Sequence, residues 1–270
     1  MTKGLRDLTA EEGRSAFGWD TANYASARPG YPDWVFQTLQ QRCNLRPNTA
    51  TFEIGPGTGQ ATARLIALGA VPLVAIEPDA RLAAFLRTRF GGAVQVANST
   101  FEDVVLEESS FALGTAATSF HWLSQGPALA KVARLLRRGG WWASWWNVFG
   151  DPERDDPFHE ATKELLQNLA DSPSHHAGEA HPFALDRARR LAEINAAGAF
   201  DDVQVDIRKW TFVLSTAQTR ALYATFSQFS ILDAAERERI LDSLARIAEE
   251  EFGGRVERNM CTALYIARRV

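Results

Sequence analysis

A glycine-rich turn, Glu53-Ile54-Gly55-Pro56-Gly57-Thr58-Gly59, is the segment of this sequence best suited to hold a ligand. It follows a short apolar run and precedes a helical pattern, so it lies where a strand passes into a helix. The first N–H groups of a helix have no partner within it, and glycine lets a ligand approach the main chain closely. We therefore expect the backbone at Gly55, Gly57 and Gly59 to line a binding site.

The next apolar run ends in an acidic residue, Glu77, which Pro78 follows. A carboxylate at the carboxyl end of this strand accepts hydrogen bonds from both hydroxyls of a ribose, each contributing roughly 1.5–3 kcal/mol. NAD enzymes share this geometry. Their fingerprint, however, requires a third small residue at the position that Gln60 occupies here, because the helix packs on the strand at that point. An NAD-dependent oxidoreductase is thus a weaker alternative.

Short apolar runs alternate with helical patterns up to Asn147, which is typical of βαβ units and a parallel sheet covered by helices on both faces. The pattern predicts strands over Ala50–Ile54, Leu73–Glu77, Ala93–Ala97, Phe111–Thr118 and Gly140–Trp146, with helices over Thr58–Leu68, Asp79–Phe90 and Pro127–Leu136. Beyond Asn147 it predicts helices over Pro157–Leu169, Leu185–Ala197, Ala217–Phe229 and Asp233–Glu251. Two further strands, Val203–Leu214 and Met260–Arg268, would close the sheet edge as an antiparallel pair.

These elements give an α/β fold, a doubly wound sheet of seven mainly parallel strands with an antiparallel C-terminal pair and an inserted helical cap. We divide the chain into residues 1–48, a helical lead-in or lid, and residues 49–147, the ligand-binding core. Residues 148–200 would form the inserted cap, and residues 201–270 would complete the sheet.

Four more motifs lie along the chain, one before the glycine-rich turn and three after it. They are the lead-in Tyr24–Pro32, the run Asn98–Asp103 after the third strand, the Phe-His-Trp signature within Thr118–Leu123, and the turn Leu135–Gly140 before the fifth strand. Together with the turn Glu-x-Gly-x-Gly-x-Gly, this set resembles the class I S-adenosylmethionine (SAM) dependent methyltransferases of the type 11 group. The resemblance implies a Rossmann-like core, a small-molecule methyl acceptor, SAM as cofactor and S-adenosylhomocysteine as product.

The resemblance also assigns a role to each cofactor-binding residue. Gly55, Gly57 and Gly59 would line the methionine part of SAM, with Glu53 bracing the loop. Glu77, beside Pro78, would hold the ribose.

Further contacts follow from the same resemblance. Phe101 and Glu102 would flank adenine, and Thr118 would offer its carbonyl to the methionine amino group. Tyr24 and Arg28 would close over the cofactor, with Arg28 facing its carboxylate.

On the acceptor side, His121 is the candidate general base, because it follows a strand's carboxyl end and has an ordinary pKa of about 6.5. The alternative is that His121 only packs beside Trp122 and shapes the site. Four of the eight tryptophans fall between Trp141 and Trp146. Since side chains alternate along a strand, Trp141 and Trp145 should share one face. Trp146 and Asn147, at the end of this strand, are candidate acceptor contacts.

The overall composition narrows the partners. Lys plus Arg number 29 against 33 Asp plus Glu, a net charge of −4, which gives no attraction toward nucleic acid. No window has the roughly 20 apolar residues that a membrane span requires, and we expect a cytoplasmic protein. We expect no metal site, because the three histidines between 175 and 181 lack the spacing of a zinc site. We expect Cys43 and Cys261 to be reduced thiols.

A non-catalytic SAM-binding protein is the remaining alternative to an enzyme. It would keep the glycine-rich turn and lack a productive acceptor site. The sequence indicates neither the acceptor nor an oligomeric state.

Overall fold

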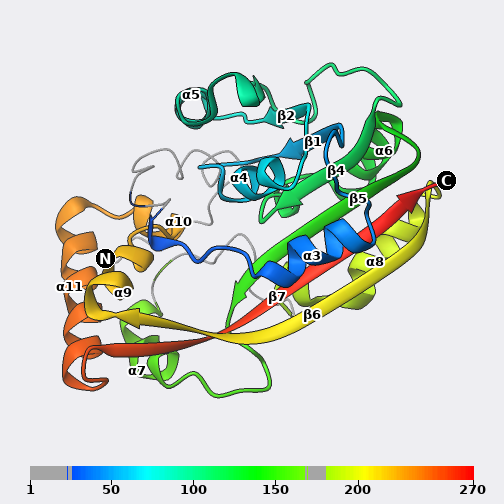
Figure 1. Cartoon of the computed structure of the whole chain (residues 1–270). Helices are drawn as coiled ribbons and strands as arrows, with labels where there is room; N and C mark the ends of the chain where they lie inside the picture. The colour runs from blue at the N-terminus through cyan, green and yellow to red at the C-terminus, as the bar shows by residue number, and fades with distance from the viewer. Residues whose placement is uncertain (1–22, 24–25, 168, 170–180) are drawn as a thin grey trace. The chain divides into compact units, whose positions relative to one another are not determined.

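The computed structural model describes residues 23, 26–167, 169 and 181–270. Seven strands form one sheet in the order β3-β2-β1-β4-β5-β7-β6 (Figure 1). The strands are β1 (Thr51–Ile54), β2 (Leu73–Ile76), β3 (Gln95–Ala97), β4 (Phe111–Ala117), β5 (Leu136–Phe149), β6 (Phe200–Ser215) and β7 (Arg255–Arg269). The α-helices are α3 (Asp33–Gln41), α4 (Gln60–Ala67), α5 (Ala80–Phe90), α6 (Gln125–Leu135), α7 (Pro157–Leu166), α8 (Arg187–Ala196), α9 (Thr216–Tyr223), α10 (Ser227–Ser230) and α11 (Ala234–Glu250). Three 3-10 turns are η1 (Gly91–Ala93), η2 (Phe120–Trp122) and η3 (Phe183–Leu185).

The parallel core of the sheet follows the predicted βαβ order. β1 pairs in parallel with β2 and with β4, β2 pairs with β3, and β4 pairs with β5. Every residue of β1 and β2 is buried, as expected where both faces are covered. The predicted α/β fold class, with a seven-stranded and mainly parallel sheet, is confirmed.

The chain divides into two compact units. The sheet unit comprises residues 30–147, 183–207 and 262–270. The helical unit comprises residues 1–29, 148–182 and 208–261. α3 and α8 both fall in the sheet unit, although the sequence-based division placed them in the lead-in and in the cap.

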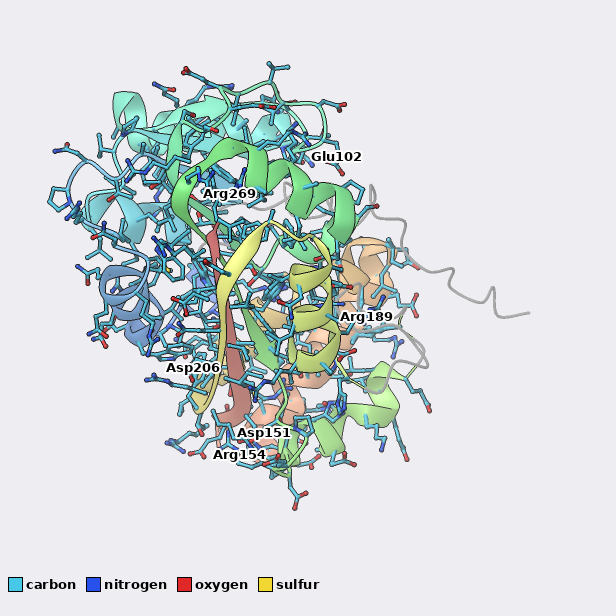
Figure 2. All side chains as sticks on the ribbon, turned by 90° about the vertical axis from the view of Figure 1, so that its right-hand side faces the viewer. Glu102, Asp151, Arg154, Arg189, Asp206 and Arg269 are labelled. Carbon is cyan, nitrogen blue, oxygen red and sulfur yellow. The ribbon has the colours of Figure 1, made fainter. Side chains whose placement is uncertain are left out.

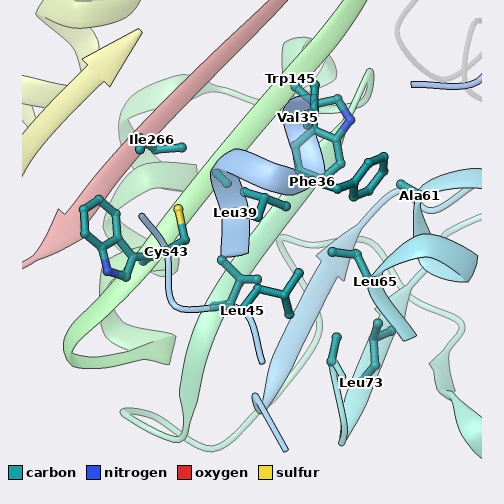
Figure 3. Close-up of a cluster of buried hydrophobic side chains, with 14 of the residues drawn as sticks. Val35, Phe36, Leu39, Cys43, Leu45, Ala61, Leu65, Leu73, Trp145 and Ile266 are labelled. Atoms are coloured by element: carbon teal, nitrogen blue, oxygen red, sulfur yellow. The ribbon is translucent and has the colours of Figure 1, made fainter. Parts of the chain in front are cut away.

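Alternation along β5 separates its tryptophans between the two faces of the sheet unit. Trp141 and Trp145 lie together in one hydrophobic cluster with α3, whose Val35, Phe36 and Leu39 are buried there (Figure 3). The expectation that these two indoles share a face is confirmed. The edge of the Trp145 ring contacts the ring of Phe36, with the centroids 6.0 Å apart.

The opposite face of β5 is covered by α6 and α8. Trp142, Ser144 and Trp146 line a small cavity there, together with Leu129 from α6 and Ile194 from α8. The cavity has room for about one water molecule. Helices therefore pack on both faces of β5, which is the doubly wound arrangement that the sequence predicts.

The helical unit has its own hydrophobic cluster. It is built from α7, α9 and α11, with buried residues that include Phe158, Leu222 and Leu244. The single helix predicted over residues 217–229 is two helices, α9 and α10. The chain leaves the helical conformation at Phe226, whose φ and ψ are extended, and the ring of Phe226 packs edge-on against Phe149.

A buried ionic network ties three elements of the helical unit together. Arg258 of β7 donates from Nε to Asp156 Oδ2 at 2.9 Å and from Nη1 to the hydroxyl of Tyr223 at 2.6 Å. The other oxygen of Asp156 accepts the N–H of His159 and so caps α7. Arg258, Asp156 and Tyr223 are all buried. The network therefore joins β7 to the start of α7 and the end of α9.

A second ion pair lies after β5, where Arg154 Nε is 2.8 Å from Asp151 Oδ2 (Figure 2). Lys209 also approaches Asp151 at 3.1 Å, and the carboxylate is buried between the two cations. Burial opposes ionisation of Asp151, yet the N–H of Glu153 and the two cations outweigh it and lower its pKa.

Of the helices in the described residues, none is long and apolar enough to cross a membrane.

Candidate functional site

The three glycines between β1 and α4 all have a positive φ, but they face different surroundings. A Cβ at Gly55 would lie 2.6 Å from Cβ of Ser119, and one at Gly59 would lie 2.5 Å from the ring of Phe90. A Cβ at Gly57 would meet no heavy atom within 4 Å. Gly55 and Gly59 thus permit close packing, and Gly57 leaves its main chain open to approach.

Glu77 follows β2 and bonds directly to the glycine loop. Its Oε2 accepts the N–H of Gly57 at 3.1 Å, and its Oε1 accepts the N–H of Asp79 at 3.0 Å. Burial raises the pKa of Glu77 to about 7, against the lowering effect of these two hydrogen bonds. The carboxylate therefore connects the glycine loop to the start of α5.

Glu53 lies beneath the loop, within β1, and is fully buried. Its Oε2 accepts from Thr62 Oγ1 of α4 at 2.6 Å. Its Oε1 has no hydrogen-bond partner among the described residues. Burial raises the pKa of Glu53 to about 7, with a further contribution from the nearby charge of Glu77.

The carboxyl end of β4 carries a strained residue, Thr118, with φ of 56°. This left-handed conformation is rare for a β-branched residue and typically marks a functional position. The N–H of Thr118 donates to the carbonyl of Trp145, and its Oγ1 accepts from the hydroxyl of Tyr31 at 3.0 Å. The next residue, Ser119, donates to the carbonyl of Ile54 at 2.5 Å. These bonds hold the end of β4 against the glycine loop.

His121 and Trp146 form a pair after β4 and near the end of β5. Trp146 Nε1 donates to His121 Nδ1 at 3.1 Å. The turn that carries His121 is held by Gln125, whose amide donates to the carbonyls of Phe120 and Leu123. The indole of Trp146 is buried. Its N–H is thus already engaged with His121.

The segment after β3 was predicted to flank adenine. Phe101 is buried, and its ring stacks on Phe52 with the centroids 6.2 Å apart. Glu102 is exposed (Figure 2). Lys131 of α6 donates to the carbonyls of Glu102 and Val104 and so fixes the path of this loop.

Asn98 joins this segment to the end of β2. Its amide donates to the carbonyls of Glu77 and Pro78, at 2.9 and 3.0 Å. Sequence reasoning assigned no role to Asn98, Lys131, Tyr31 or Ser119. Asn98, Tyr31 and Ser119 each lie within a motif that carries the resemblance, which was the available signal, whereas Lys131 lies in none.

The core of this site matches a known family model. Residues 52–144 match the model of a methyltransferase domain. An uncharacterized methyltransferase of Schizosaccharomyces pombe is 24% identical over 260 residues, which cover 94% of this chain and 97% of the relative. The chain therefore carries a methyltransferase domain and has methyltransferases among its relatives. The resemblance of the sequence to methyltransferases is thus confirmed.

Solved structures share the fold of this methyltransferase. Phosphoethanolamine N-methyltransferase 2 of Haemonchus contortus aligns with a TM-score of 0.55 at 11% identity, covering 94% of this chain and 56% of that one. The [4+2]-cyclase SpnF aligns with a TM-score of 0.58 at 16% identity, covering 99% of both chains. At such identities the likeness establishes the fold, and a cyclase among the neighbours shows that the fold does not fix the reaction.

The loop of this methyltransferase fits SAM, the cofactor of its family. The main chain at Gly57 is open, and the carboxylate of Glu77 lies next to it. The unpartnered Oε1 of Glu53 is a buried acceptor on β1, the strand that leads into the same loop. An uncharged interior would not require these polar groups, whereas a polar cofactor gives them a use.

The remaining predicted residues have partners within their own units. Arg28 of the helical unit donates to the side chain and carbonyl of Thr225, and its guanidinium lies 4.6 Å from the ring centroid of Phe226. Asn147 of the sheet unit donates to the carbonyl of Gly30 and accepts from Thr262 Oγ1 at 2.7 Å. Tyr24 lies outside the described residues.

The predicted absence of a metal concerns three histidines, of which His175 and His176 lie outside the described residues. His181 is exposed. Over the described part of the chain, no group of three or more His, Cys, Asp or Glu side chains is placed to hold a metal ion.

Alanine at Gly59 should destabilise this methyltransferase more than alanine at Gly57. Both variants force a residue with a Cβ to keep a positive φ, at a cost of about 1 kcal/mol. Only Gly59→Ala also drives its Cβ into Phe90, which adds about 1–3 kcal/mol. Urea denaturation of both variants measures the difference. Equal losses of stability would contradict the assigned surroundings of the two glycines.

Replacement of Glu53 by glutamine should stabilise the protein at about pH 8 and leave it unchanged below about pH 4.5. Because the pKa of Glu53 rises from 4.5 to about 7 on folding, the folded state binds the extra proton between these values. The free energy of unfolding therefore falls as the pH rises through this window. Glutamine removes the buried charge, so the expected gain at pH 8 is about 3 kcal/mol. Denaturation curves at several pH values test this, and a variant as pH-dependent as the wild type would contradict it.

Proposed function

We propose that this methyltransferase transfers the methyl group of SAM to a small-molecule acceptor. The observation that carries the proposal is the open main chain at Gly57 beside the buried carboxylate of Glu77. The two groups lie at the carboxyl ends of adjacent parallel strands, which is where ligands bind in open α/β sheets.

The cofactor-binding roles follow from this placement. Gly55, Gly57 and Gly59 would line the methionine part of SAM, and Glu77, beside Pro78, would accept from the ribose hydroxyls. Glu53 would support the loop from below. The open space at Gly57 supports the assignment to the methionine part. Each oxygen of the Glu77 carboxylate accepts one backbone N–H and keeps a further lone pair, which supports the assignment to the ribose.

Five further residues complete the proposed cofactor site. Phe101 and Glu102 would border adenine, with the backbone held in place by Lys131. Thr118 would accept the methionine amino group through its carbonyl, which its strained conformation supports. The assignment of Arg28 and Tyr24 to a segment that closes over the cofactor rests on the sequence resemblance alone and stays a prediction.

When bound, SAM supplies a methyl group activated by the adjacent sulfonium. The protein's task is then to bind the two reactants, orient them in line and exclude water. Such alignment contributes up to about 7–11 kcal/mol to the lowering of a barrier. The hydrogen bonds of Thr118 with Tyr31 and of Ser119 with Ile54 tie the end of β4 to its neighbours and support this positioning role.

A small acceptor is favoured by the aromatic residues near the ends of β4 and β5. Trp122, Trp146 and the ring of His121 lie together there, and sites for small molecules are mostly apolar with a few polar groups. Asn147 would supply one such polar group.

A net charge of −4 argues against nucleic acid as substrate. We also propose a cytoplasmic location, which the two buried free thiols Cys43 and Cys261 support.

Two measurements in sequence test the proposal. Calorimetry with SAM, S-adenosylhomocysteine and NAD should show binding of the first two and no binding of NAD. Incubation with methyl-labelled SAM and pools of small acceptors should then release S-adenosylhomocysteine with a labelled product. Binding of NAD without SAM would indicate an oxidoreductase, and SAM binding without turnover of any pool would indicate a non-catalytic SAM-binding protein.

A further inference from the structure

The hydrogen bond between Trp146 and His121 fixes where the imidazole carries its proton. An indole N–H is a donor and has no acceptor capacity. Because Trp146 Nε1 lies 3.1 Å from His121 Nδ1, that ring nitrogen must be the acceptor and must be unprotonated. A neutral imidazole with an unprotonated Nδ1 carries its proton on Nε2.

Trp146 differs from two neighbouring tryptophans of β5 in this respect. The indole N–H groups of Trp142 and Trp145 are buried and have no acceptor among the described residues. The N–H of Trp146 has one, and that acceptor is a histidine after the neighbouring strand. Packing alone therefore does not require an indole N–H on this strand to be satisfied.

The pair is held from a third side by η3. The ring of Phe183 packs against both partners, with its centroid 5.9 Å from His121 and 5.5 Å from Trp146. On Phe183 itself lies the guanidinium of Arg190, 3.5 Å from the ring centroid. Tyr265 contacts Trp146 edge-on. Neither ring is therefore free to rotate independently of this packing.

We propose that Trp146 is a positioning residue that holds His121 as the neutral tautomer protonated on Nε2. In this state Nδ1 is occupied by the indole N–H and Nε2 already bears a proton. His121 is then a hydrogen-bond donor and cannot remove a proton from an acceptor. The sequence-based role of general base is replaced by that of a donor that orients the acceptor.

The consequence for the acceptor rests on the proposed function. With no base at this position, the acceptor must already be nucleophilic when it binds, as an anionic oxygen or sulfur is. Its lone pair forms the bond to the methyl carbon while the electron pair of the carbon–sulfur bond stays on the sulfonium sulfur. The anionic acceptor becomes neutral, the sulfonium becomes a thioether, and no proton has to leave.

Nitrogen and carbon NMR of protein labelled at histidine tests the tautomer directly. In the wild-type protein at about pH 8, His121 should show an unprotonated Nδ1 and a protonated Nε2. His121→Gln identifies the signal by its loss. Trp146→Phe keeps an aromatic ring and removes the N–H donor, so the His121 signal should move toward a mixture of the two tautomers.

Trp141→Phe is the matched control, since Trp141 lies on the same strand and the opposite face. It should leave the His121 tautomer unchanged. A protonated Nδ1 in the wild-type protein would overturn the proposal without any variant, as would a His121 signal that Trp146→Phe does not change. Calorimetry with SAM on the wild-type protein reports separately on the proposed function. Absent SAM binding with the expected tautomer would refute that function and leave the role of Trp146 intact.

Discussion

Replacement of Glu77 by glutamine should weaken SAM binding by about 100- to 1000-fold. In the proposed site the carboxylate would accept charge-assisted hydrogen bonds from two ribose hydroxyls, each contributing roughly 1.5–3 kcal/mol. A tenfold change in affinity corresponds to about 1.4 kcal/mol. The carboxylate also accepts the N–H of Gly57, and a glutamine amide group turned toward that N–H would repel it. Calorimetric titration with SAM measures the loss.

Glu108→Gln is the matched control for this substitution, because Glu108 is exposed and pairs only at the surface with Arg134. It should keep the wild-type affinity for SAM. A Glu77→Gln protein that binds SAM within about threefold of the wild type would contradict the ribose assignment.

The affinity of the wild-type protein for SAM should also rise as the pH increases through about 7. The pKa of Glu77 is raised to about 7 by burial, so the carboxylate that would accept from the ribose is mostly ionised only above this pH. The glutamine of Glu77→Gln has no proton to lose, so the weaker SAM binding of this variant should lack this rise with pH. A wild-type affinity for SAM that falls between pH 6 and pH 8 would contradict the predicted direction of the pH dependence.

Replacement of Arg258 by methionine should lower the free energy of unfolding by about 3–5 kcal/mol. The substitution leaves the Asp156 carboxylate buried without its cation, and breaking one half of a buried ion pair has a cost of this size. It also removes the donor to the Tyr223 hydroxyl, which is itself buried. Urea denaturation, followed by the fluorescence of the protein, measures the change.

A double variant and a surface control make this result specific. Asp156→Asn in the Arg258→Met background removes the stranded charge and should recover about 2 kcal/mol, while the asparagine still caps α7. Arg255→Met changes an exposed arginine of the same strand and should cost less than about 0.5 kcal/mol. A double variant no more stable than Arg258→Met alone would show that the buried charge is not the cause.

The sequence by itself determined the sheet-building elements. β1, β2 and β4 are short apolar runs bounded by turn residues, and their burial on both faces makes the pattern unambiguous. Asp79, the first residue of the helix predicted over Asp79–Phe90, caps the N-terminus of α5. The faces of the tryptophans on β5 followed from the period of two along a strand.

The glycine loop and the acid after β2 were also readable, because their chemistry depends on residues close together in the chain. What the sequence could not supply is the pairing of side chains between strands. Glu77 bonds to Gly57 across twenty positions, and Asn98 reaches the carbonyl of Glu77 across twenty-one. No local pattern encodes such contacts.

Only the tertiary structure decided the state of His121. The sequence placed a titratable imidazole after a strand and left its role open between a base and a packing residue. The parallel pairing of β4 with β5 brings Trp146 next to it, and the indole N–H then fixes the tautomer. Sequence determined which groups are present at the ends of the strands. The register between strands determined which of these groups meet. The position of the proton on His121 depends on Trp146, which lies twenty-five residues away along the chain and is brought close only by the pairing of β4 with β5.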